Sequence, residues 1–405
     1  MMEVEDELQD SATPCLHLVS AFLACEPPDF VISFARDCGG GSITESVQSF
    51  IWNQCINKFD VKCNGHYLRS FLKKLIVEVE SNGDVVLDEI YEMYIYCLTT
   101  LKDEELTKGN IRTLRRVSFL LPKDCSRASS CQITRKLEFT LQCSLNMLEG
   151  DTGCSIWPSG LFLSEFILSF PELFSNKSCL EVGSGVGLVG VCLAHVNASK
   201  VVLTDGDLST LANMKLNLEL NQLHTDMLDH TQDTKIVQCL SLPWESATEN
   251  ELHQFLPDIV LGADVMYNPL CLPYLVQLLA VLLKRENPKL HPLSNGCKDC
   301  PPVWRCFESE ETSSAGDNVS PGKAKINGDT HVQHLSPGLG QGPLAYIASV
   351  IRNIDTFNYF LSLAEKENLI VSDITETMKP LDLLPYVKSY QRSSIRMFKI
   401  SYLCK

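Results

Sequence analysis

The clearest candidate for chemistry is a glycine-rich turn after a short apolar segment. Residues 178–182 predict a strand, and the run Gly183-Ser184-Gly185-Val186-Gly187 follows it directly, ahead of a predicted helix. Glycine lets the backbone bend sharply and approach a ligand closely, and the first turn of a helix has free N–H groups. A P-loop is excluded because no Gly-Lys-Ser/Thr follows, and the dinucleotide fingerprint would want a small residue where Leu188 stands. The turn therefore indicates a ligand site, and the alternative is a tight strand-to-helix connection.

Two carboxylates lie at the ends of successive predicted strands. Glu181 comes just before the turn, where an acidic side chain suits a ligand with an amine better than one with a pyrophosphate. Asp205 ends the next strand (200–204), where a carboxylate can accept both hydroxyls of a ribose. S-adenosylmethionine carries an amine, a sulfonium and a ribose but no phosphate, so these residues favour it as the cofactor. The alternative for Asp205 is a role as helix N-cap.

A third group of candidates follows the predicted strand 258–263. Ligands of open α/β sheets bind outside the carboxyl ends of the strands, so Asp264 and Tyr267 are expected near the reaction centre. The alternative is an N-cap followed by a core aromatic residue. Trp157 and Trp244 lie in predicted turns, where they would provide apolar walls for an adenine ring or a methionine tail, or else pack in the core.

Alternating elements from Gly160 onward would bring these residues together. We expect helices over 161–170, 207–221, 269–284 and 355–367, and strands over 178–182, 200–204, 236–240, 258–263, 345–350, 369–374 and 395–403. This alternation predicts an α/β fold with a doubly wound, mainly parallel, seven-stranded sheet and helices on both faces.

The first part of the chain differs from the α/β part in the spacing of its apolar residues. Apolar positions at helical spacing predict helices over 67–79 and 87–101, and residues 117–121 and 137–143 predict the two strands of a hairpin. We therefore divide the chain into three parts. They are an N-terminal helical module (12–105), a β-hairpin connector (106–150) and an α/β domain (151–405).

One segment inside the α/β domain breaks the pattern. Residues 287–341 are rich in Ser, Gly, Pro and charge, so we expect a flexible insertion. Its four potential zinc ligands are Cys297, Cys300, His331 and His334. The gap between the two pairs is far longer than zinc-finger spacing, and we expect no metal site.

The composition limits the class of protein. The net charge is −16, which argues against general binding of nucleic acid. The acidic N-terminus is unlike a signal peptide, and the longest apolar stretches are too short to cross a bilayer. The 18 cysteines are scattered and fit reduced thiols. We expect a cytoplasmic protein without membrane or direct nucleic-acid contacts.

Taken together, the motifs resemble the seven-β-strand class I (Rossmann-like) methyltransferases. Within them, the chain is similar to the protein-lysine group marked by Asp-x-x-Tyr after the fourth strand, which Asp264-Val265-Met266-Tyr267 matches. The similarity is greatest to the lysine methyltransferases of eukaryotic elongation factor 2. Further matching segments are 67–80, 87–92, 150–153 and 350–353.

The resemblance implies a site and a substrate. It implies S-adenosylmethionine contacts at Trp157, Gly183, Ser184, Gly185, Trp244 and Ala263. It also implies an elongation factor 2 lysine as substrate, and we expect a monomer. Methyl transfer needs a neutral amine in line with the methyl group, so Asp264 and Tyr267 would orient the lysine as catalytic residues, and Asp264 would help to deprotonate it.

Other functions stay open at this point. The chain could methylate another protein, RNA or a small molecule, or be a non-catalytic scaffold that binds the cofactor. Base-amino methyltransferases typically have a motif similar to Asn/Asp-Pro-Pro-Tyr at the fourth strand. In this sequence Val265 and Met266 occupy the two proline positions.

Overall fold

The computed structural model describes residues 13–100, 112–122, 133–144, 152–223, 237–284 and 342–403. All of them belong to one compact unit. The expected insertion over 287–341, with its four candidate zinc ligands, lies outside the described residues, as does Gly150.

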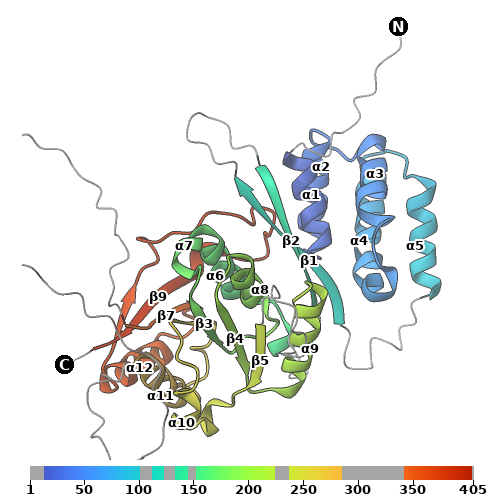
Figure 1. Cartoon of the computed structure of the whole chain (residues 1–405). Coiled ribbons are helices and arrows are strands. Elements are labelled where there is room, and N and C mark those ends of the chain that lie inside the picture. The colour runs from blue at the N-terminus through green and yellow to red at the C-terminus, as the bar shows by residue number, and fades with distance from the viewer. Residues whose placement is uncertain are drawn as a thin grey trace, which may run out of the picture. The chain divides into compact units, whose positions relative to one another are not determined.

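A seven-stranded sheet forms the centre of the α/β part, with the order β5-β4-β3-β6-β7-β9-β8 (Figure 1). The strands are β3 (Ser178–Val182), β4 (Lys200–Asp205), β5 (Val237–Ser241), β6 (Ile259–Ala263), β7 (Leu344–Val350), β8 (Leu369–Asp373) and β9 (Ile395–Tyr402). The first five are parallel, and β9 runs antiparallel to both of its neighbours. The predicted doubly wound, mainly parallel, seven-stranded sheet is confirmed.

Helices cover both faces of this sheet because its inner strands are apolar on both sides. In β4, Val201 and Leu203 join the core on one face, whereas Val202 joins the core on the other. The first face packs against α6 (Pro158–Ser169), α8 (Leu188–His195) and α9 (Leu208–Leu220), and the second against α11 (Leu272–Leu283) and α12 (Ile354–Lys366). Two further short helices are α7 (Pro171–Phe174) and α10 (Glu249–Leu252).

The strand order reverses between β3 and β6, which creates a crevice at their carboxyl ends. Val182 of β3 pairs with Thr204 of β4 on one side and with Gly262 of β6 on the other. Three strands therefore end side by side, and the residues after each strand meet at one edge.

Five of the described α-helices lie before residue 101, in the segment predicted to form a helical module. They are α1 (Thr13–Leu23), α2 (Pro28–Cys38), α3 (Glu45–Ile51), α4 (Val61–Ser81) and α5 (Asp88–Thr100), and a π-helical turn (Trp52–Ile56) follows α3. The predicted helices over 67–79 and 87–101 are confirmed as α4 and α5. Among the helices of the described ranges, none has the length and apolar character needed to cross a membrane.

The predicted hairpin is also confirmed, as β1 (Arg112–Pro122) paired antiparallel with β2 (Ile133–Ser144). Asparagine side chains pair with the backbone at both of its outer edges. Asn64 of α4 donates to the Leu114 carbonyl at 3.0 Å and accepts from the Leu114 amide at 2.9 Å. Asn217 of α9 accepts from the Gln142 amide at 2.7 Å and donates to its carbonyl at 3.2 Å. The hairpin is therefore tied to helices on both sides.

The connection between β8 and β9 was not predicted to have a structural role. Buried Glu165 of α6 accepts from the amides of Leu383 and Leu384 at 2.7 and 3.2 Å and from Arg392 Nε at 3.0 Å. A buried carboxylate needs several donors, and this segment supplies them.

Candidate active site

A cavity of about 720 Å³ lies at the carboxyl ends of β3, β4 and β6. It is lined by residues after each of these strands and after β5, by the segment before α6 and by Arg352 after β7. Eight of the ten residues predicted from the sequence line this cavity: Trp157, Gly183, Gly185, Asp205, Trp244, Ala263, Asp264 and Tyr267. The structure thus brings together candidates that lie more than a hundred positions apart.

The glycine turn forms a close wall of the cavity. Gly183 and Gly185 have φ angles of 64° and 54°, a region that residues with a side chain rarely adopt. A Cβ atom at Gly183 would lie 3.1 Å from Val265, and one at Gly185 would lie 3.1 Å from the Gly153 carbonyl oxygen. The turn therefore leaves bare backbone, which a ligand can approach closely.

Asp205 faces the cavity from the end of β4. Its Oδ2 accepts from the Gly185 amide and its Oδ1 from the Asp207 amide, each at 3.1 Å. Burial raises the pKa of Asp205, although these backbone donors act in the opposite direction. The N-cap of α9 is Asp207, which accepts from the Thr210 amide at 2.7 Å, so the capping alternative for Asp205 is wrong. Each Asp205 oxygen has capacity for a further donor.

Asp264 is buried at the end of β6 and has a resident partner. Its φ angle of 58° lies in the left-handed region, which Asp tolerates better than most residues. Arg352 donates from Nη2 to Oδ2 at 2.7 Å and from Nη1 to Oδ1 at 3.1 Å. This bidentate ion pair was not expected. Each Asp264 oxygen therefore already accepts a hydrogen bond from the Arg352 guanidinium.

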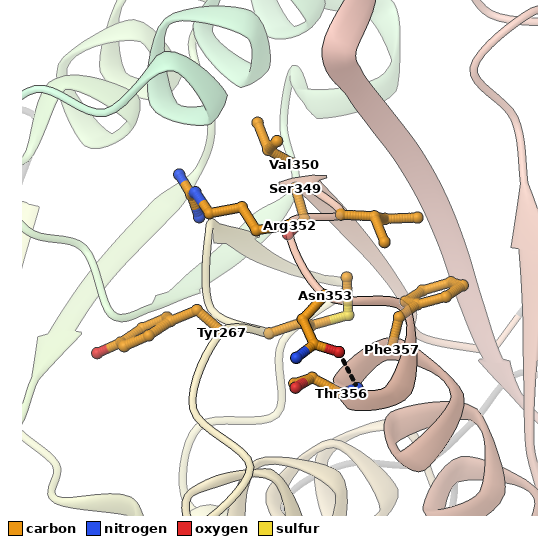
Figure 2. Close-up of a pocket in the computed structure, with 9 residues that line it drawn as sticks. Tyr267, Ser349, Val350, Arg352, Asn353, Thr356 and Phe357 are labelled. Atoms are coloured by element: carbon orange, nitrogen blue, oxygen red, sulfur yellow. Dashed lines mark hydrogen bonds between the residues drawn. The ribbon is translucent and has the colours of Figure 1, made fainter.

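Tyr267 is 65% exposed and lies on the walls of two cavities. The smaller one has a volume of about 60 Å³ and lies between the end of β7 and the first turn of α12 (Figure 2). In Figure 2 the side chains of Tyr267 and Arg352 extend to one side, and Phe357 extends to the other. Tyr267 and Arg352 line both cavities, so they mark the boundary between the two.

Two tryptophans form apolar parts of the large cavity. Trp157 precedes α6, and its indole N–H donates to the Thr152 carbonyl at 3.0 Å. Trp244 begins a 3₁₀ turn (Trp244–Ser246) and lies 3.5 Å from the Cβ position of Gly183. Flat apolar surfaces at these places suit an aromatic base or an aliphatic chain.

Glu181 and Ser184, the other two predicted residues, are buried and do not line the cavity. Ser184 Oγ accepts from the Thr204 amide at 3.0 Å, which ties the end of β3 to β4. Burial raises the pKa of Glu181 to about 8, and its Oε2 has no hydrogen-bond partner among the described residues. Their assignment as cofactor contacts stays a prediction.

Sequence reasoning did not assign a role to Arg352 or Glu245, which also line the cavity. The rule that located Asp264, that ligands bind at the carboxyl ends of strands, applies equally to β7 and would have found Arg352. Glu245 lies beside Trp244 in a turn that no periodicity marks.

The charge of the large cavity is acidic. Its described lining contains four carboxylates (Asp205, Asp207, Glu245 and Asp264) and a single Lys or Arg side chain, that of Arg352. This lining suits a ligand that carries positive charge. In the described ranges, no group of three or more His, Cys, Asp and Glu is placed to hold a metal ion.

Comparisons with known proteins agree with the predicted resemblance. Residues 136–294 match a family model described as "Lysine methyltransferase". The chain is 32% identical over 215 residues to human "Protein-lysine N-methyltransferase EEF2KMT", and this match covers 53% of this chain and 59% of that protein. It is 27% identical over 260 residues to Saccharomyces cerevisiae "Protein-lysine N-methyltransferase EFM3", which covers 58% of this chain and 69% of that protein.

An uncharacterized protein of Dictyostelium discoideum is 30% identical over 266 residues, covering 61% of this chain and 58% of that protein. The matches thus span about six-tenths of the length of the Dictyostelium and human relatives. The resemblance to the elongation factor 2 lysine methyltransferases, predicted from the motifs, is confirmed by these relatives.

Proposed function

We propose that this protein is an S-adenosylmethionine-dependent protein-lysine N-methyltransferase that modifies elongation factor 2. One observation carries the proposal: the glycine turn, the strand-end carboxylate of Asp205 and the Asp-x-x-Tyr segment line one acidic cavity, at the point where the strand order of the sheet reverses. The named relatives support the choice of a protein lysine and of elongation factor 2.

The residues present fit the cofactor. A Cβ atom at Gly183 or Gly185 would fill the space beside the glycine turn, so this space suits a ligand that lies against the backbone. Asp205 would accept the ribose hydroxyls, and Trp157 and Trp244 would flank the apolar parts. When bound, S-adenosylmethionine supplies a methyl group activated on a positively charged sulfonium.

The acceptor side of the site is formed by Asp264 and Tyr267. Positioning and electrostatics are the main catalytic terms for methyl transfer, because the protein needs no covalent intermediate. The Tyr267 ring would pack along the aliphatic part of the lysine, and the Asp264 carboxylate would offset the positive charge that develops on nitrogen.

The cysteines and the net charge support a cellular location and a class of substrate. We propose a cytoplasmic location, because all twelve described cysteines are free thiols, which suits a reducing compartment. The acidic charge supports a protein substrate without direct nucleic-acid contact.

The test is incubation of the purified full chain with purified elongation factor 2 and labelled S-adenosylmethionine. We expect label on a lysine of elongation factor 2, and mass spectrometry should show up to three added methyl groups. Total RNA and a cell extract serve as parallel substrates. Label on RNA, or on another protein with none on elongation factor 2, would contradict the proposed substrate.

A further inference from the structure

We propose that Arg352 is a positioning residue that holds Asp264 and Trp157 together across the cofactor cavity, an arrangement we call the Arg352 clasp. The inference rests on the proposed methyltransferase function, since it concerns how that site is organised. Arg352 follows β7 and lies on the walls of both cavities.

The guanidinium contacts two parts of the site at once. Its two Nη atoms donate to the two carboxylate oxygens of Asp264 at 2.7 and 3.1 Å. Its Cζ lies 5.5 Å from the centre of the Trp157 ring. Arginine can use its edge for a carboxylate and its face for an aromatic ring, whereas the point charge of lysine cannot do both in this geometry. One side chain thus links the end of β6 to the start of α6.

Asp264 depends on this partner for its orientation. The Asp264 side chain is 6% exposed. Its other donors are distant, namely the Val350 amide at 3.4 Å and the Ser349 hydroxyl at 3.5 Å. A buried carboxylate that loses its cation is strongly disfavoured. Without Arg352 we therefore expect Asp264 to turn or to take up a different partner.

The clasp also changes what Asp264 offers to a substrate. In the proposed reaction the acceptor nitrogen must be neutral to attack the methyl group. Because Arg352 balances part of the Asp264 charge, Asp264 holds the incoming lysine less tightly as an ammonium ion than an unpaired carboxylate would. Asp264 is then an oriented acceptor for the neutral amine.

A second ion pair provides a matched control. Arg396 of β9 donates to Asp373 of β8, with Nε at 2.9 Å from Oδ2. The exposed fractions of the two arginine side chains are 48% for Arg396 and 47% for Arg352. Both pairs join neighbouring parts of the same sheet, but neither Arg396 nor Asp373 lines the large cavity.

The test compares Arg352→Gln, Arg352→Lys and Arg396→Gln in the full chain. The steady-state kinetics of elongation factor 2 methylation, which gives kcat and KM, and the cofactor affinity by calorimetry are measured for each. We expect Arg352→Gln to lower kcat by about thirtyfold, or roughly 2 kcal/mol, with the KM for elongation factor 2 and the cofactor Kd within about threefold of wild type. Arg352→Lys should recover only part of the rate, and Arg396→Gln should leave kcat, KM and Kd unchanged. A rate for Arg352→Gln within about twofold of wild type would overturn the proposal.

The pair is tested further by combining Arg352→Gln with Asp264→Asn. If the two residues act as one unit, the double variant should be no slower than the slower single variant, whereas independent effects would multiply. The same cycle in thermal unfolding needs no substrate. Non-additive losses in Tm support the clasp even if wild-type protein fails to label elongation factor 2, and additive losses contradict it. Failure of the proposed function and failure of the clasp therefore give different results.

Discussion

Polar side chains have different roles in two regions of this molecule, the cavity at the sheet and the edges of the β-hairpin. At the carboxyl ends of the sheet, Asp205 and Glu245 face a cavity. At the β-hairpin, Asn64 and Asn217 instead bind the backbone of a strand edge. Polar groups that satisfy each other inside the chain stabilise a fold, whereas polar groups with capacity left at a cavity can bind a ligand. The comparison separates candidates for function from candidates for stability.

The first way to sharpen the comparison is to fill the cavity at the glycine turn. We expect Gly185→Arg to abolish S-adenosylmethionine binding, because even a Cβ at this position lies 3.1 Å from the Gly153 carbonyl oxygen. Calorimetry measures the binding, and circular dichroism checks the fold. Unchanged affinity in the folded variant would refute the location of the cofactor.

Gly83→Arg is the control for backbone strain. Gly83 also has a positive φ angle, 78°, but nothing lies within 4 Å of its Cβ position. Both variants should lose some stability, since a side chain at positive φ is strained. Only Gly185→Arg should lose the cofactor.

The second way is to break the hairpin contact. The Asn217 amide accepts one hydrogen bond from Gln142 and donates to the carbonyls of Gln142 and Val186. Asn217→Ala removes the partner of the Gln142 amide and of the Val186 carbonyl, whereas the Gln142 carbonyl keeps its hydrogen bond from Asn213 at 3.0 Å, so the free energy of unfolding should fall by about 2–4 kcal/mol. Urea unfolding measures the loss, and exposed Leu216→Ala on the same helix is the control. A similar value for both variants would show that the contact has no net effect.

The third way is to compare two carboxylates in one turn. Asp205→Ala removes a charged acceptor worth roughly 1.5–3 kcal/mol, so cofactor affinity should fall by about one to two orders of magnitude. Asp207→Ala removes the N-cap of α9 and should cost about 1 kcal/mol of stability with little loss of affinity. Calorimetry measures the affinity and thermal unfolding measures the stability. If Asp205→Ala lowers stability and leaves the affinity unchanged, Asp205 is a structural residue and the assignment is wrong.

Local sequence signals could be read before the structure was known, whereas contacts between distant residues could not. The strands and the glycine turn were predictable because apolar runs and turn residues are local signals, and the strand-end rule placed Asp205 and Asp264 at one edge. The Arg352–Asp264 pair was not, since the two residues are 88 positions apart and nothing local couples them. The contacts of Asn64 with β1 were missed for the same reason: a helix asparagine that binds a distant strand looks like any exposed polar residue.

Glu181 tests the limit of the comparison, because it is a strand-end carboxylate that does not face the cavity. It is buried, and burial raises its pKa from 4.5 to about 8. The folded protein therefore binds one more proton than the unfolded chain between these two pH values. Stability should fall as the pH rises from about 4.5 to about 8, by up to roughly 1.4 kcal/mol per pH unit from this group alone.

Glu181→Gln removes this titration while keeping the shape of the side chain. The variant should gain stability relative to wild type as the pH rises from 5 to 8, and urea unfolding at several pH values measures the difference. Glu165→Gln is the contrasting control: its carboxylate is paired with Arg392, so the substitution leaves a partly buried cation without its partner and should lower stability at pH 8. Parallel pH profiles for wild type and Glu181→Gln would mean that the pKa of Glu181 in the fold is close to its value in the unfolded chain. That outcome would contradict the pH dependence expected from the burial of Glu181.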